Sequence, residues 1–196
     1  MAQDAPAFEG DVKRGQQLSY TCNGCHAIPN YKNVYPTYSV PKLHGQRPQY
    51  LVAALKAYKS GERSHGTMHS QAASMSEQDM ADIAAYLAGP KVLSESKNEA
   101  TADRPKAGEV CLACHGSNGV GITPDYPTLA GQHRDYLIRA LTDYKKGGRK
   151  NMVMAPMAAN LTASDIEELA AYYSARSPSL DVVPKKVTFA SADAAK

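Results

Sequence analysis

The chain has 196 residues, of which 43% are hydrophobic and 21% charged, so it contains enough apolar material for one or two packed domains. The formal net charge is only +3, and without a dense basic stripe the composition disfavours nucleic-acid binding. The longest apolar runs are far too short to cross a bilayer, so no transmembrane segment is expected. We interpret the tightest basic cluster as a solvated helix end: Lys145, Lys146, Arg149 and Lys150.

The elements predicted along the first half are helices. A short helix over Asp11–Thr21 comes first, and apolar residues between Tyr50 and Tyr58 then recur at three- and four-residue steps, which indicates an amphipathic helix. A further helix begins with the capping signature Ser76-x-x-Asp79. Its predicted buried stripe consists of Met80, Ile83, Ala84 and Leu87. Because no run alternates as a strand would, the sequence predicts an all-α protein.

The second half of the chain repeats the first. Shifted by 86 residues, Pro41–Ala88 falls on Pro127–Ser174 with 19 of 48 positions identical. Two tandem domains are therefore expected, over residues 1–90 and 107–176, joined by a polar linker at 91–106. The remaining residues, 177–196, are interpreted as a tail that is draped over the surface or disordered rather than part of a core.

All four cysteines lie in two Cys-x-x-Cys-His motifs, which are typical of covalent c-type haem attachment. Two thiols at this spacing can form thioethers with the two vinyl groups of one porphyrin, and the adjacent imidazole can bind its iron. Zinc binding would leave the histidines unexplained. A thioredoxin-like dithiol would need a strand–helix context, and disulfides across three residues would be strained. The motifs thus predict two haem c groups, held by Cys22, Cys25 and His26 and by Cys111, Cys114 and His115.

A second axial ligand for each iron is predicted from the repeat. Met68 overlies Met154, whereas Met75 overlies Leu161 and Met80 overlies Ile166, so the last two methionines are better explained as core. Met152 and Met157 have no methionine counterpart. His65 and His69 flank Met68 and leave bis-histidine ligation open for the first haem only, while His44 and His133 are expected at the surface.

The order Cys-x-x-Cys-His, Pro-x-Leu-x-Gly, Met and C-terminal helix resembles class I cytochromes c. The duplication, with Gly-Gln after Pro-x-Leu, resembles the diheme cytochrome c4 family. The resemblance implies two cytochrome c domains related by a pseudo-twofold axis, with haem propionates near their interface. It also implies that the carbonyls of Pro41 and Pro127 accept hydrogen bonds from His26 and His115.

The family resemblance further implies a soluble periplasmic electron carrier, not an enzyme, that passes electrons toward a terminal oxidase. The expected partners are a quinol-oxidising complex or a dehydrogenase as donor and a haem–copper oxidase as acceptor, with peripheral membrane association allowed. Residues 1–6 lack the features of a secretion signal, so if the protein is exported we expect that a signal was removed; whether Met1 is native stays open. Two alternatives stay open: an electron-accepting subunit of a periplasmic dehydrogenase, such as a thiosulfate-oxidising one, and a diheme enzyme or gas sensor with an open iron.

Two features lie outside the family pattern or admit two roles. The first copy has a longer loop between His26 and Pro41, with tyrosines that could shield the haem or face a partner, although plain packing of the loop is favoured: Tyr31, Tyr35 and Tyr38. Arg63 and Arg149 occupy the same position of the repeat. They are candidates to pair with haem propionates, and an exposed, solvated role is the alternative.

Overall fold

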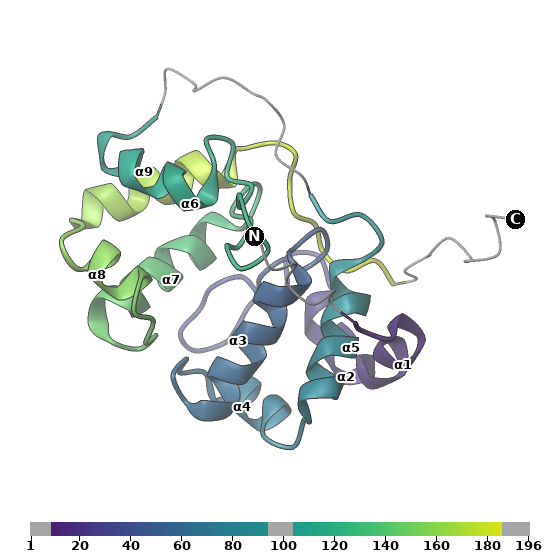
Figure 1. The fold of residues 1–196 in the computed structure, drawn as a ribbon. Helices are drawn as coiled ribbons and strands as arrows, with labels where there is room; N and C mark the ends of the chain where they lie inside the picture. Colours follow the sequence, from purple (N-terminus) through teal and green to yellow (C-terminus); the bar gives the residue numbers. More distant parts are fainter. Residues whose placement is uncertain (1–8, 94–103, 186–196) are drawn as a thin grey trace, which may run out of the picture.

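The computed structural model describes residues 9–93 and 104–185, and the regular structure in these ranges is helical (Figure 1). The few β-type pairings there are isolated bridges. The prediction of an all-α protein with two tandem domains is confirmed. The exact domain boundaries stay a prediction, and most of the predicted linker, residues 94–103, lies outside the described residues. None of the helices in the described ranges is long and apolar enough to cross a membrane.

The first domain is built around the packing of its first helix on its last. Helix α3 packs on both α5 and α4, so that one core lies between these elements. The helices of this domain are α1 (Val12–Leu18), α2 (Tyr20–His26), α3 (Pro48–Ser60), α4 (Gly66–Ala72) and α5 (Glu77–Ala88).

The second domain repeats this arrangement in shortened form. Helix α7 packs on α9 and α8, and a 3-10 helix, η1, packs on α9 where α1 packs on α5 in the first domain. The elements of this domain are η1 (Lys106–Cys111), α6 (Leu112–His115), α7 (Arg134–Lys146), α8 (Met154–Ala159) and α9 (Ala163–Ser174).

The sequence patterns of the repeated helices form the expected local structure. Ser76 and Thr162 each cap their helix through a reciprocal pair of hydrogen bonds with Asp79 and Asp165, as the capping signatures predicted. The stripe that was predicted on α5 is buried, with exposed fractions of 0–5%. The helix that was expected over Asp11–Thr21 ends at Leu18, after which α2 carries the first cysteine motif.

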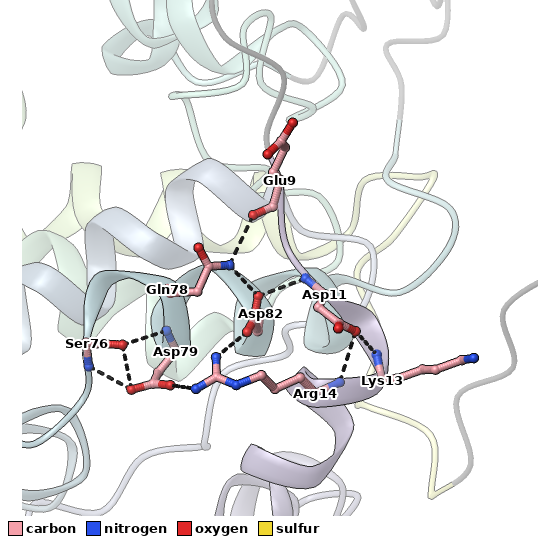
Figure 2. Close-up of polar contacts among 8 residues, drawn as sticks. All are labelled: Glu9, Asp11, Lys13, Arg14, Ser76, Gln78, Asp79 and Asp82. Carbon is pink, nitrogen blue, oxygen red and sulfur yellow. Dashed lines mark hydrogen bonds and ion pairs between the residues drawn. The ribbon is translucent and has the colours of Figure 1, made fainter.

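The crossing of α1 and α5 depends on a glycine and a buried carboxylate. A Cβ on Gly15 would lie 2.0 Å from the carbonyl oxygen of Asp82, so only glycine allows the two backbones to approach so closely. The Asp82 side chain is 1% exposed; it accepts hydrogen bonds from the backbone N–H of Asp11 at 2.8 Å and from Gln78 at 2.7 Å. Figure 2 shows the Arg14 guanidinium bridging this carboxylate and that of Asp79.

The described part of the segment after α9, residues 177–185, corrects the prediction of a tail outside the core, while residues 186–196 lie outside the described residues. In Figure 1 it runs from the second domain to the first. Leu180 and Val183 are each 1% exposed, and Val183 belongs to the core cluster of the first domain. The backbone of Asp181 pairs with that of His44, and the N–H of Val183 donates to the carbonyl of His26 at 3.0 Å. Since the N–H of Leu180 donates to Ala130 at 2.9 Å, this segment, the strap, is tied to both domains.

The two domains also meet through the loops that follow α3 and α7. Arg63 and Arg149 form an antiparallel bridge. On either side of it, the N–H of Ser64 donates to Gly148 at 2.9 Å and the N–H of Lys150 donates to Glu62 at 2.7 Å. These loops occupy equivalent places in the repeat, so the contact is symmetric, as a pseudo-twofold axis requires.

Candidate functional site

A cavity of about 790 Å³ lies in the first domain and reaches the second. It brings together the predicted site residues of the first copy: Cys22, Cys25, His26, Pro41, Arg63 and Met68. Its apolar walls include Leu51 and Leu55 of α3 and Ile83 of α5, and Leu129 reaches it from the second domain. A volume of this size, with apolar walls and a few polar groups, suits a large flat cofactor.

His26 ends α2 and is oriented by a backbone carbonyl. Its Nδ1 lies 3.0 Å from the carbonyl oxygen of Pro41. The protein packed around the ring lowers the pKa of the His26 imidazole to about 4, because it disfavours the charged form. A neutral ring whose Nδ1–H donates to Pro41 keeps the Nε2 lone pair for a metal ion.

His115 has the same geometry in the second domain. Its Nδ1 lies 3.0 Å from the carbonyl oxygen of Pro127, and the residue is 5% exposed. Burial lowers the pKa of this imidazole as well. Cys111 packs against the core cluster that contains Leu137 and Leu169, so the cysteine motif lies against the apolar interior of its domain.

The two methionines that the repeat singled out lie in the first turns of equivalent helices. Met68 is the third residue of α4, borders the cavity and packs against the core of the first domain. Met154 is the first residue of α8, which packs on α7, and it is half-buried. Their roles as axial ligands stay predictions.

The rival histidines near Met68 have other hydrogen-bond partners. His65 also borders the cavity, but its Nδ1 accepts from the backbone N–H of Met68 at 3.2 Å, and its Nε2 lies 3.2 Å from Asn33 Oδ1. The Nδ1 of His69, an exposed residue, lies 2.8 Å from the carbonyl oxygen of Tyr58. His65 therefore supports the segment that carries Met68, a role that sequence reasoning missed.

The remaining candidates divide between core and surface. Met80 is 1% exposed and belongs to the core, as predicted, while Met152 is 94% exposed and Met157 is 49% exposed. His44 corrects the expectation of a surface residue: its ring is half-buried and lies so close to Gly89 that a Cβ there would collide with it.

The other readings of the cysteine motifs have no support in the described residues. None of the four cysteines forms a disulfide. Burial raises the pKa of the Cys22 and Cys111 thiols, because their surroundings disfavour the charged thiolate. In the described part of the chain, no group of three or more His, Cys, Asp or Glu side chains could hold a metal ion by itself. A porphyrin would supply the ligands that such a cluster lacks.

Arg63 and Arg149 correct two expectations, because neither is solvated. They are 9% and 6% exposed, so Arg149 does not belong to a solvated helix end. Both guanidinium groups donate to the hydroxyl of Tyr136 and stack on tyrosine rings, Arg63 on Tyr58 and Arg149 on Tyr144. Burial raises the pKa of Tyr136, but the charges of Arg149 and Arg63 outweigh it and lower the pKa to about 8.

The tyrosine-rich loop of the first domain borders the cavity and is packed only in part. Tyr38 is half-buried, with its ring at right angles to that of His65. Tyr35, in contrast, is 96% exposed and its neighbour Val34 is 89% exposed. Plain packing of the loop therefore accounts for Tyr38 and is wrong for Tyr35.

Comparisons with known proteins agree with this architecture. The cytochrome c family model matches residues 12–90 and again residues 107–175. Cytochrome c4 of Pseudomonas aeruginosa is 34% identical over 83% of this chain and 87% of its own length. The crystal structure of reduced cytochrome c4 from Pseudomonas stutzeri covers 86% of this chain and all of its own, with a TM-score of 0.66 and 31% identity. A thiosulfate dehydrogenase electron acceptor of Stutzerimonas stutzeri is 29% identical over 84% of this chain and 82% of its own length.

These matches, together with the fold and the duplicated motif, establish the class of protein. The chain belongs to the cytochrome c family and, within it, to the two-haem cytochromes c4. It carries two covalently bound haem c groups, one in each domain. Its chemistry is accordingly electron transfer, for which the haem iron supplies the redox change while the protein supplies ligands, a low dielectric and a docking surface.

Proposed function

We propose that this protein is a periplasmic electron carrier, not an enzyme, that passes single electrons between redox proteins through its two haems. The observation that carries the proposal is the repetition of one arrangement: in both copies the histidine of the cysteine motif bonds to a proline carbonyl at 3.0 Å. In each domain this bond leaves the Nε2 of a neutral imidazole available to a haem iron, which supports one redox centre in each copy.

The axial ligands in this proposal are His26 with Met68 and His115 with Met154, and the cysteines of each motif form the thioethers. Histidine–methionine ligation raises the reduction potential of haem iron. An iron that keeps both ligands in both oxidation states reorganises little on electron transfer. The bond from His26 to Pro41 fixes the ring plane before and after transfer, and the core around Met68 limits access of water.

Arg63 and Arg149 serve in this proposal as partners of the haem propionates. Among the described residues no carboxylate pairs with either arginine, although both are buried. Burying a guanidinium group without an anion is costly, and a tyrosine hydroxyl compensates only in part. Arg63 borders the cavity, so a carboxylate of the bound haem is a suitable counter-ion.

The partners proposed are a quinol-oxidising complex or a dehydrogenase as donor and a haem–copper oxidase as acceptor. The similarity to cytochromes c4 and the ordinary charge of the chain support this proposal. Contacts with such partners are expected to be small and short-lived. Rapid-mixing spectroscopy tests the proposal: reduced protein should be oxidised by oxidase-containing membranes at a rate proportional to its concentration.

A second candidate is the electron acceptor of a thiosulfate dehydrogenase. The relative from Stutzerimonas stutzeri bears that name and matches over most of both chains, which favours this candidate over other dehydrogenases. Reduction of both haems by thiosulfate and the dehydrogenase, together with co-purification in fixed stoichiometry, would support it. A free carrier would elute alone.

The haem content and coordination test the core of the proposal. After denaturation and acid extraction, protein matured in a competent host should retain two haems per chain. The ferrous protein should bind carbon monoxide poorly at neutral pH, because both irons are six-coordinate. Ready binding by the unmodified protein would instead favour a gas sensor or a diheme enzyme.

A further inference from the structure

Two glutamines at the same position of the repeat reach across the domain boundary. Gln46 and Gln132 follow the Pro-x-Leu-x-Gly motif of their copies and are 3% and 4% exposed. The side chain of Gln46 accepts from the backbone N–H of Thr128 at 2.8 Å and donates to the carbonyl of Thr128 at 2.9 Å. Gln132 makes the same two bonds, both 2.9 Å long, to the backbone of Lys42.

The orientation of each glutamine amide is fixed by its own domain. The Oε1 of Gln46 also accepts from the backbone N–H of Arg47 at 2.9 Å, and the Oε1 of Gln132 accepts from that of His133 at 3.0 Å. Each amide thus faces two backbone donors with its oxygen and one backbone acceptor with its nitrogen. A reversed amide would place like groups together in all three bonds.

Each glutamine hydrogen-bonds to the peptide group that orients the histidine of the other domain. The N–H of Lys42 and the carbonyl of Pro41 belong to one peptide group; the carbonyl accepts from His26, and the N–H donates to Gln132. In the second domain, the peptide between Pro127 and Thr128 connects His115 to Gln46 in the same way. Both hydrogen-bonded chains cross from one domain to the other.

A series of hydrogen bonds from glutamine through a peptide group to histidine transmits an electronic effect. A peptide whose N–H donates to an acceptor is polarised, and its carbonyl becomes a stronger acceptor. The histidine that donates to this carbonyl then becomes a more basic ligand, and hydrogen bonding around the axial ligand is one of the means by which a protein sets a haem potential. A more basic imidazole favours ferric iron and lowers the potential.

We propose that Gln46 and Gln132 are positioning residues that each tune the haem of the opposite domain, Gln46 through His115 and Gln132 through His26. The inference rests on the proposed function, because it takes His26 and His115 as iron ligands. Docking of the two domains thereby lowers the reduction potentials of both haems. Each domain affects the haem potential of the other without direct contact between the haems.

The test uses Gln46→Met and Gln132→Met in the full two-haem protein, because methionine keeps the shape of the side chain and removes its hydrogen bonds. The control is Gln17→Met at an exposed position of α1. A redox titration followed by NMR gives the potential of each haem separately. In the ferrous protein, the Nδ1–H resonances of His26 and His115 report the strength of each bond to proline.

Each substitution is expected to affect the haem of the opposite domain. Gln46→Met raises the potential of the second haem and weakens the bond from His115 to Pro127. Gln132→Met raises the potential of the first haem and weakens the bond from His26 to Pro41. The Gln17→Met control changes neither potential and neither bond. A shift at the haem of the substituted domain, no shift, or a shift of both potentials, including one caused by separation of the domains, overturns the inference. If the unmodified protein shows no haem-shifted Nδ1–H resonance, the ligand assignment itself fails, which is a different outcome.

Discussion

His65 and Asn151 occupy the same position of the repeat and make the same bond with different chemical groups. The Nδ1 of His65 accepts from the backbone N–H of Met68 at 3.2 Å, and the Oδ1 of Asn151 accepts from that of Met154 at 2.8 Å. Each side chain therefore caps the segment that presents the proposed axial methionine. The second bonds differ: the Oδ1 of Asn151 also accepts from the N–H of Val153 at 3.0 Å, whereas the Nε2 of His65 lies 3.2 Å from Asn33 Oδ1 in the tyrosine-rich loop.

His65→Ala should loosen the Met68 segment, at a cost of about 1 kcal/mol for the lost cap. The absorption band that reports methionine–iron bonding should weaken for the first haem only. His65→Asn should restore most of this band, because asparagine performs the capping role at Met154. If the asparagine variant behaves like the alanine variant, the cap is not what holds the methionine.

Met154→Ala should open the second haem, lower its reduction potential and allow it to bind carbon monoxide. The first haem should remain nearly unchanged, because Met68 lies in the core of its own domain. A redox titration with optical detection measures both effects. Met157→Ala is the matched control, since Met157 belongs to the same helix and is 49% exposed. Equal loss at both haems would contradict the proposed ligand assignment.

Gly15→Ala should destabilise the first domain by about 1–3 kcal/mol, the usual cost of forcing extra atoms into a packed contact. The new Cβ would lie 2.0 Å from the carbonyl oxygen of Asp82, so α1 must move away from α5. Urea unfolding followed by circular dichroism measures the loss. Gly24→Ala is the control, because nothing lies within 4 Å of its Cβ position and the second copy has Ala113 there.

The ion pairs of Arg14 should give the first domain a specific sensitivity to acid. Hydrogen bonds from the side chain and backbone of Ser76, and then from Arg14, lower the pKa of Asp79 to about 2. Because this pKa lies below the ordinary value of about 3.9, the stabilisation is complete above about pH 4 and is lost as the pH falls toward 2. Burial raises the pKa of Asp82, but its hydrogen bonds outweigh burial and the net shift is downward, which adds to the same loss.

Asp79→Asn should therefore flatten the decline in stability between pH 4 and pH 2, as followed by helical circular dichroism. Asp165→Asn is the matched variant, since Asp165 has the same capping bonds from Thr162. In the described part of the chain, Asp165 has no arginine partner, so its effect should be smaller. Equal flattening in both variants would assign the acid sensitivity to the caps alone.

Val183→Ala should destabilise the protein by about 1.5 kcal/mol, at roughly 0.8 kcal/mol for each buried methylene-sized group. Val183 is 1% exposed and belongs to the core of the first domain, although it follows the last helix of the second. Val182→Ala, at the half-buried position beside it, should cost clearly less. Thermal unfolding compares the two variants, and equal effects would mean that the strap is not anchored by Val183.

The sequence by itself determined the helical fold, the duplication and the haem motifs, because these depend on local spacing. The caps of α5 and α9 and the stripe on α5 were predictable from residues close in sequence. The bonds from His26 and His115 to proline were implied by the family resemblance, and the structure contains both.

Only the tertiary structure decided which polar residues are buried and which domain they serve. The sequence predicted that Arg149 belongs to a solvated basic cluster, but Arg149 is buried where the loops after α3 and α7 contact each other. Residues 177–183 carry no helical period, so the burial of Leu180 and Val183 depends on contacts that this segment makes with both domains. Gln46 and Gln132 are visible in the sequence as a repeated pair, but their exchange of partners follows from the pseudo-twofold arrangement, which no local pattern encodes.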